Sequence, residues 1–297
     1  MKKKVFITGS NGFIGSHIMN YFLNKGYETI GCDIISSNTS YKVDLTSESE
    51  TIDFINKETP DIVIHCAGNA NVNSSVENPK MDYLSNVVVT QNVLKALKEL
   101  NNKPRMVFLS SAAVYGNQEL LPINEKATLN PLSPYAENKI KCEEMCKQAN
   151  LEDSVEVKIA RIFSVYGSGL KKQIFWDMHN KIVNTGKLEM FGTGNESRDY
   201  IHINDLLDVI FLLSTEETEY DVFNVANGEE IYIKDVAKMF AEVNNVKVVY
   251  FNGVEMKGNP LNWKADISRI KSLGYNPKIS IKDGIKEYSD WVKSINE

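Results

Sequence analysis

Residues 5–15 read VFITGSNGFIG, an apolar run of β type that leads directly into a turn with three glycines. Residues 14–25 follow with apolar side chains every three or four positions, which is the spacing of an amphipathic helix. Gly9 permits a tight turn, Gly12 lets the backbone approach a pyrophosphate, and Gly15 lets the helix pack closely on the strand. Strand, glycine turn and helix together predict a dinucleotide-binding unit at the start of the chain.

The next predicted strand, residues 29–32, is followed by Asp33. In dinucleotide-binding domains an acidic residue at this place accepts hydrogen bonds from the adenosine ribose. Its carboxylate would repel a 2′-phosphate, so we expect NAD rather than NADP as the cofactor. Two residues, rather than one, separate the first two glycines, and this spacing resembles that of the short-chain dehydrogenase/reductase superfamily.

Short apolar runs alternate with helical stretches as far as residue 160, a pattern typical of a parallel sheet wound with helices. The runs are residues 5–8, 29–32, 61–65, 105–109 and 155–160, and the clearest helical stretches are 14–25, 81–100 and 135–147. We therefore predict an α/β fold, a Rossmann doubly wound parallel sheet with a smaller, interleaved C-terminal domain. Residues 1–166 would bind NAD, rejoined by about 201–228, and residues 167–200 and 229–297 would bind substrate.

Composition narrows the possible partners of the chain. With 297 residues, 42% hydrophobic and 24% charged, it has room for a large core but has no apolar run of about 20 residues that could span a membrane. A net charge of −6 without a basic tract disfavours nucleic acid as a partner. The four cysteines are scattered, and Cys142 and Cys146 have no second pair at metal-ligand spacing, so we expect no metal, no disulfide framework and a cytoplasmic location. His65 and His202 lie in strand-like runs and are expected to pack or hydrogen-bond rather than to catalyse.

A candidate catalytic group lies farther along the chain. Ser110 and Ser111 end a predicted strand, and Tyr135 and Lys139, four residues apart, share one face of a predicted helix. An ammonium beside a phenol stabilises the phenolate, so the tyrosine can take or give a proton while a hydride moves, and the serine can hold the substrate oxygen. A tyrosine and a lysine at this spacing also occur on ordinary solvated helices, but their order after the glycine loop and the serines favours redox chemistry.

The chain resembles an extended short-chain dehydrogenase/reductase of the nucleotide-sugar epimerase/dehydratase family, over nearly its whole length. The matching stretches, besides the glycine loop, are DL at 44–45, HCAG at 65–68, Asn86, LSSAAVYG at 109–116, PYAENK at 134–139, RIFSVYG at 161–167 and RDYIHIND at 198–205. The resemblance implies catalysis by Ser111, Tyr135 and Lys139 and a homodimer in which residues 81–100 and 135–147 pair as a four-helix bundle.

The resemblance also implies a set of binding residues. For NAD these are Gly9, Gly12, Phe13, Ile14, Gly15, Asp33, Asp44, Leu45, Cys66, Ala67, Gly68, Asn86, Ser110, Tyr135, Lys139 and Ile162. For a nucleotide-diphosphate sugar they are Ser111, Tyr135, Ser164 and Arg198. Arg198 would hold the diphosphate, because a planar guanidinium can pair with phosphate through two hydrogen bonds.

Several family reactions share this redox step and differ in their additional groups. Ala112 and Ala113 replace the Asp-Glu pair of the family's dehydratases, and Ala112 replaces the cysteine of fucose-synthase-like enzymes, so both reactions are disfavoured. Epimerisation at C4 through a 4-keto intermediate is favoured, and reduction of a 4-keto-6-deoxy nucleotide sugar is the alternative. Ser164 in place of an asparagine and the lack of a family arginine near Met256 keep that alternative open. A non-catalytic NAD-binding module is disfavoured because Tyr135 and Lys139 are both present.

Overall fold

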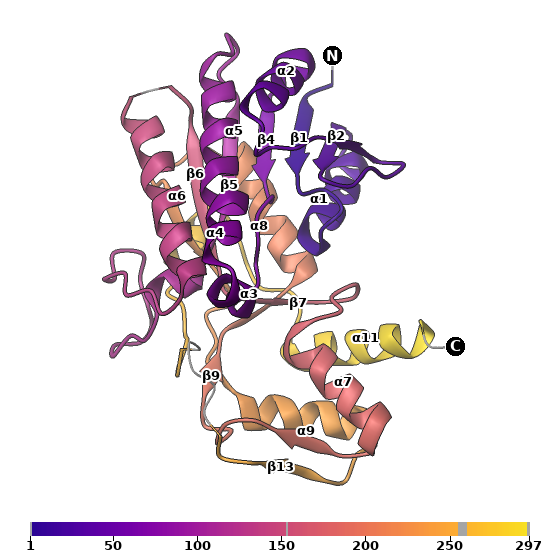
Figure 1. Cartoon of the computed structure of the whole chain (residues 1–297). Coiled ribbons are helices and arrows are strands. Elements are labelled where there is room, and N and C mark those ends of the chain that lie inside the picture. The colour runs from indigo at the N-terminus through magenta and orange to yellow at the C-terminus, as the bar shows by residue number, and fades with distance from the viewer. Residues whose placement is uncertain (1, 153, 255–259, 296–297) are drawn as a thin grey trace. The chain divides into compact units, whose positions relative to one another are not determined.

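The structure, a computed structural model, describes residues 2–152, 154–254 and 260–295 (Figure 1). It divides into two compact units that are interleaved along the chain. The first unit contains Met1–Tyr115, Thr128–Ile162 and Val209–Phe223, and the second contains Gly116–Ala127, Phe163–Asp208 and Asn224–Glu297. The assignment of NAD and substrate binding to separate domains stays a prediction.

A seven-stranded sheet forms the centre of the first unit, in the order β11-β6-β5-β4-β1-β2-β3. Its strands are β1 (Lys4–Thr8), β2 (Glu28–Asp33), β3 (Ser40–Lys42), β4 (Ile62–His65), β5 (Arg105–Ser111), β6 (Val157–Ile162) and β11 (Val222–Val225). All pairs from β3 across to β6 are parallel, with Val5 opposite both Thr29 and Ile62. The predicted α/β Rossmann fold is confirmed.

Helices cover both faces of this sheet because its strands are apolar on both faces. Phe6, Val63 and Phe108 belong to one hydrophobic core together with side chains of three helices, α2 (Glu48–Glu58), α5 (Val89–Lys98) and α6 (Pro134–Leu151). The alternate residues of the strands point the other way, where α1 (Phe13–Asn24) meets the end of α8 (Ile203–Thr215) through a Phe22–Phe211 ring contact of 5.7 Å. Both helices are labelled in Figure 1, α1 close to β2 and α8 below β4.

The predicted long helix at residues 81–100 is three consecutive pieces in the structure. These are α4 (Pro79–Tyr83), a π-helix (Leu84–Val88) and α5, preceded by the short α3 (Val72–Glu77). The predicted helix at 135–147 is α6, which begins at Pro134 after Ser133, whose side chain accepts a hydrogen bond from the Ala136 N–H. The π-helix places Asn86 at its centre, and such segments often occur at functional sites.

In its described residues the second unit contains three two-stranded sheets. They pair β7 (Ser164–Tyr166) with β10 (Tyr200–His202), β9 (Ser197–Arg198) with β12 (Ile231–Tyr232), and β8 (Leu188–Met190) with β13 (Val249–Phe251). Its helices, besides the start of α8, are α7 (Gln173–Thr185), α9 (Ile233–Val243), α10 (Ser268–Ser272) and α11 (Ile281–Ser294). Phe175 packs against Tyr166, Phe240 and Tyr288, which joins α7, α9 and α11 around an aromatic core.

Candidate active site

The glycine loop forms a backbone cradle at the carboxyl end of β1. A Cβ on Gly9 would lie 2.9 Å from the Ala67 backbone, and one on Gly15 would lie 2.2 Å from the Gly9 carbonyl oxygen. Gly12 is the N-cap of α1 and supplies no side chain to the N–H groups of the first turn, which includes Phe13 and Ile14. Unfilled N–H groups at a helix N-terminus bind anions, so the loop fits the pyrophosphate of a dinucleotide.

Asp33 ends β2 beside this loop. One of its carboxylate oxygens accepts a hydrogen bond from the Asn11 N–H at 3.1 Å, and the other has no donor among the residues that the structure describes. Asn11 also donates to the Ile35 carbonyl at 2.6 Å and accepts from the Ser37 hydroxyl at 2.8 Å. The carboxylate is therefore held in place with one oxygen left for a ribose hydroxyl.

Asp44 and Leu45 lie between β3 and α2. The Asp44 carboxylate accepts two hydrogen bonds from Thr46, at 2.9 Å from its N–H and 2.6 Å from its hydroxyl. The Leu45 side chain is buried in the core, and its carbonyl accepts from Asn92 at 2.9 Å. Leu45 can therefore contact a ligand only through its other backbone atoms. The spacing of residues in the sequence does not reveal this.

Cys66, Ala67 and Gly68 follow β4 at the same edge of the sheet. The Ala67 N–H donates to the Thr8 hydroxyl at 3.0 Å, which joins this loop to β1. Gly68 has φ +147°, and a Cβ there would lie 2.5 Å from the Asn86 side-chain oxygen. That oxygen is buried and has no hydrogen-bond partner in the described part of the chain. Burial raises the pKa of the Cys66 thiol to about 12, so this cysteine stays protonated.

His65 is the last residue of β4, directly before this loop. Burial, with a smaller effect of Lys139, lowers the pKa of His65 to about 3, so the ring is neutral. Its Nε2 lies 3.1 Å from the Thr90 hydroxyl, which donates its own proton to the Asn86 carbonyl at 2.7 Å, so Nε2 carries the hydrogen. Nδ1 then accepts from the Thr8 hydroxyl at 2.7 Å. His65 has the hydrogen-bonding role that its position predicts.

Lys139 and Tyr135 come from the first turns of α6. The buried Lys139 ammonium donates to the Leu109 carbonyl at 3.0 Å and lies 5.9 Å from the centre of the Tyr135 ring. The Tyr135 N–H donates to the Ser75 hydroxyl at 3.2 Å, whereas its phenol oxygen has no partner among the residues described. A cation beside an unengaged phenol is the arrangement that proton transfer requires.

Ser110 and Ser111 end β5 but have different surroundings. The Ser111 hydroxyl accepts from the Ala113 N–H at 3.1 Å, which leaves its own proton to donate. The Ser110 hydroxyl is buried and donates to Glu143 at 2.7 Å. Glu143 in turn pairs with Arg161 at 2.6 Å, and both side chains are fully buried beside Ile162. Sequence reasoning missed this ion pair, because its two residues lie on separate elements at no regular spacing.

Arg198 and Ser164 belong to the second unit. The Arg198 guanidinium donates to the carbonyls of Ser197 at 2.7 Å and Leu261 at 3.1 Å, and it lies 5.5 Å from the Trp263 ring. No carboxylate within 4 Å pairs with it in the described residues, and burial lowers the pKa of Arg198. Ser164 is half-buried in β7, with its N–H bonded to the Asp199 carbonyl. The segment around Met256 lies outside the described residues.

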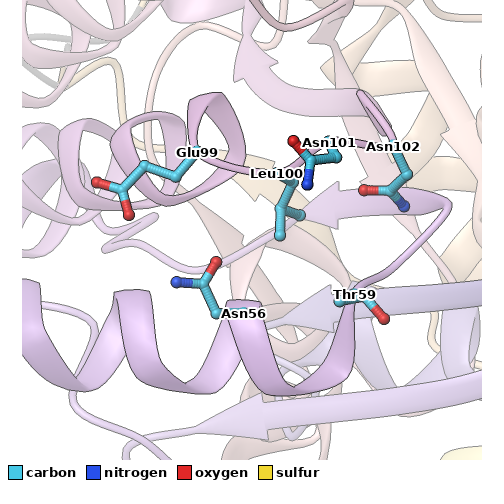
Figure 2. A pocket seen from close by; sticks show the side chains of 6 residues that line it. All are labelled: Asn56, Thr59, Glu99, Leu100, Asn101 and Asn102. Atoms are coloured by element: carbon cyan, nitrogen blue, oxygen red, sulfur yellow. The ribbon is translucent and has the colours of Figure 1, made fainter.

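A cavity of about 390 Å³ lies away from these residues (Figure 2). It is lined by Asn56, Thr59, Glu99, Leu100, Asn101 and Asn102. These residues lie in the last turn of α2 or directly after α2 and α5, before β4 and β5, so the cavity is at the amino ends of the strands, opposite the glycine loop. Ligands of doubly wound sheets bind at the carboxyl ends, so we assign no role to the cavity. No group of His, Cys, Asp and Glu side chains that could hold a metal occurs in the described residues.

Comparison with known proteins gives consistent matches. The NAD dependent epimerase/dehydratase family matches residues 5–226. A putative UDP-glucose 4-epimerase of Methanocaldococcus jannaschii is 30% identical, over 98% of this chain and 99% of its own. A GDP-6-deoxy-D-mannose reductase of Pseudomonas aeruginosa is 27% identical over the whole of both chains. The solved structure of a UDP-N-acetylglucosamine 4-epimerase from Methanobrevibacter ruminantium M1 superposes with a TM-score of 0.89 at 27% identity, covering 99% of this chain and 100% of that one.

Proposed function

The chain belongs to the NAD-dependent epimerase/dehydratase family, and we propose that it epimerises C4 of a nucleotide-diphosphate sugar through a 4-keto intermediate. The family membership and the NAD cofactor predicted from the sequence are thereby confirmed. The observation that carries the proposal is the Tyr135 phenol, which no described group engages, next to the buried ammonium of Lys139. A non-catalytic module would not need to keep a buried cation beside a free phenol, because burying a charge is costly.

In the proposed reaction Tyr135 accepts the proton of the sugar C4 hydroxyl and later returns it. Bound NAD supplies the hydride acceptor and donor at that carbon. Lys139, held by the Leu109 carbonyl, stabilises the phenolate, and Ser111 donates its free proton to the sugar oxygen. The glycine loop and Asp33 hold the dinucleotide at the carboxyl edge of the sheet. Between the two transfers the keto sugar must turn so that its other face meets the cofactor.

Dehydration is not proposed, because Ala112 and Ala113 offer no acid or base. Reduction of a 4-keto-6-deoxy nucleotide sugar is the second candidate, favoured by the full-length similarity to a GDP-6-deoxy-D-mannose reductase. The two are separated by incubating the protein with UDP-, GDP- and dTDP-sugars and their 4-keto-6-deoxy forms, with and without NADH. An epimerase interconverts two sugars without net NADH consumption, whereas a reductase consumes one NADH for each product. Failure to convert any nucleotide sugar would contradict both.

Arg198 supports a diphosphate-containing substrate, because a half-buried guanidinium without an acidic partner favours an anionic ligand. A charge-assisted hydrogen bond is worth about 1.5–3 kcal/mol. Arg198→Ala should therefore weaken UDP or GDP binding by roughly tenfold to a hundredfold and leave NAD affinity unchanged. Isothermal titration measures both affinities.

Arg269 provides the matched control for this test. It also lies in the second unit, but its guanidinium already pairs with Glu125 at 3.4 Å. Arg269→Ala should lower the thermal stability and leave nucleotide affinity unchanged. Equal nucleotide affinity of Arg198→Ala and the unmodified protein, or no nucleotide binding by the latter, would remove the support for this substrate class.

A further inference from the structure

Asp82, in α4, is a fully buried carboxylate that receives three side-chain amides. Its Oδ1 accepts from Asn69 at 2.7 Å and from Asn86 at 3.2 Å, and its Oδ2 accepts from Asn138 at 2.8 Å. The side chain is 1% exposed, and no lysine, arginine or histidine lies within ion-pair distance of it in the described residues. A buried negative charge without a cation is stabilised only by such hydrogen bonds, so all three are needed.

The three amides come from three separate parts of the candidate NAD site. Asn69 directly follows Gly68 in the loop after β4, and Asn86 is at the centre of the π-helix. Asn138 lies in α6, three residues after Tyr135 and one before Lys139. One carboxylate therefore connects the loop, the π-helix and the helix that carries the phenol and the ammonium.

Asp82 also determines how the amide of Asn86 is turned. The Asn86 nitrogen donates to the Asp82 carboxylate and to the Asp82 carbonyl, the latter at 3.1 Å. With the nitrogen so engaged, the oxygen must point the opposite way, toward Gly68, where a Cβ would lie 2.5 Å from it. Gly68 is exposed and follows the strand end at which dinucleotides bind.

We propose that Asp82 is a positioning residue that fixes the loop at Gly68 relative to the Tyr135 and Lys139 pair. Bound NAD then lies in the correct position relative to the Tyr135 phenol. This inference rests on the proposed function, because it takes Tyr135 and Lys139 as the reacting pair. In this proposal Asp82 contacts neither NAD nor the nucleotide sugar, and it acts through Asn69, Asn86 and Asn138. A loop displaced by about 1 Å would misplace the cofactor and can lower the rate about a hundredfold.

The test exchanges the residue types at positions 82 and 138, first one at a time and then together. Asp82→Asn turns an amide toward the Asn138 amide and removes the charge, so NAD affinity should fall about tenfold. Asn138→Asp sets two carboxylates against each other and should lower NAD affinity at least as much. In the double variant the new amide at position 82 donates to the new carboxylate at position 138, while its oxygen still accepts from Asn69 and Asn86. NAD affinity should then return to within about threefold of the unmodified protein.

UDP or GDP affinity is measured in the same titrations, because it depends on Arg198 and should stay constant. Asn150→Ala is the control: Asn150 lies at the other end of α6 and bonds both backbone groups of Val157, at 2.9 and 2.7 Å. It should lower the thermal stability without changing NAD affinity. If Asp82→Asn and Asn138→Asp do not fold, Asn138→Ala takes their place, because it removes the amide that donates to Asp82 without bringing two like groups together, and NAD affinity should again fall about tenfold.

NAD affinity in Asp82→Asn within twofold of the unmodified protein would overturn the positioning role and leave the proposed function intact. The same follows if the double variant binds NAD no better than the single ones, or if nucleotide affinity falls in parallel. An unmodified protein that does not bind NAD would instead overturn the proposed function and this inference with it.

Discussion

At the scale of single residues, the Tyr135 hydroxyl is the atom on which the proposed chemistry depends. Tyr135→Phe removes this oxygen and leaves the ring, which is nearly buried, in place. We expect the fold and NAD affinity to be retained and turnover to fall by about 10²- to 10⁴-fold, the range typical of a lost general acid or base. Steady-state kinetics together with NAD titration measure both quantities. Activity close to that of the unmodified enzyme would show that another group transfers the proton.

Lys139 has a second expected role, in binding the cofactor. Lys139→Met keeps much of the side-chain volume but removes the ammonium that donates to Leu109, so we expect lower turnover and weaker NAD binding. Lys158 is a matched control, since it is equally buried but its ammonium bonds the carbonyls of Thr218 and Tyr220. Lys158→Met should destabilise the protein and leave NAD affinity unchanged. Unchanged NAD affinity in Lys139→Met would contradict the binding role.

Asp33 is expected to select NAD over NADP. Its carboxylate is fixed by the Asn11 N–H, so it cannot easily move away from a 2′-phosphate. NAD should bind at least about tenfold more tightly than NADP. Asp33→Asn, which keeps an oxygen for the Asn11 N–H, should reduce the difference between the NAD and NADP affinities. Equal binding of the two cofactors by the unmodified protein would show that Asp33 does not face the ribose.

His65 makes the stability of the protein sensitive to acid. Its folded-state pKa of about 3 lies below the ordinary 6.5 of the unfolded chain, so below pH 6.5 the unfolded state binds a proton that the folded state does not. Above pH 6.5 this difference in proton binding has no effect on the free energy of unfolding. As the pH falls from 6.5 toward 3, it lowers the free energy of unfolding by about 1.4 kcal/mol per pH unit. In His65→Gln the free energy of unfolding should fall less steeply between pH 6.5 and 5, as measured by urea denaturation. Parallel curves for the two proteins would contradict the shifted pKa.

At the scale of elements, the apolar pattern predicts the strands of the sheet well and the local helix type poorly. Residues 5–8 and 61–65 differ from β1 and β4 by a single residue, because buried parallel strands are continuous apolar runs. The π-helix at Leu84–Val88 could not be predicted, since one wider turn leaves the apolar spacing of residues 81–100 almost unchanged.

In the candidate site, too, some residues can be predicted from the sequence and others cannot. Gly9, Asp33 and Tyr135 have recognisable sequence surroundings, and the structure places all three in one unit. The carboxylate of Asp82 and the pair of Glu143 with Arg161 have no such signal, because their partners are brought together only by tertiary packing. Motifs therefore predict the groups that would meet ligands, and the structure is needed for the groups that hold them.

The helices α5 and α6 carry the prediction of a homodimer. Their apolar side chains are inside the core of the first unit, whereas Lys95, Lys98, Glu137, Lys141 and Glu144 are exposed. An interface here would be polar and held partly by charge, so we expect a dimer at low salt that weakens as ionic strength rises. Light scattering at micromolar concentration should give twice 33.5 kDa at low salt. A monomer under these conditions would rule the dimer out.

At the scale of the whole molecule, the predicted ligand contacts fall on different units. All predicted NAD contacts are in the first unit, whereas Ser164 and Arg198 are in the second. No helix among the described residues has the length and apolar character needed to cross a membrane, and a cytoplasmic location stays a prediction. Residues 116–127 join the second unit although only a short 3-10 helix (Ala112–Tyr115) separates them from β5.

The return of the chain to the first unit at Val209–Phe223 has a consequence for synthesis. Strand β11 occupies the edge of the sheet beside β6, yet about 60 residues of mostly second-unit sequence separate the two strands. While the ribosome makes that stretch, β6 is an uncovered edge, which can pair with other chains. The nascent protein therefore cannot complete its first unit before two segments of the second, Gly116–Ala127 and Phe163–Asp208, have been synthesised. For the same reason a single recombination event cannot exchange either unit between two genes of this family.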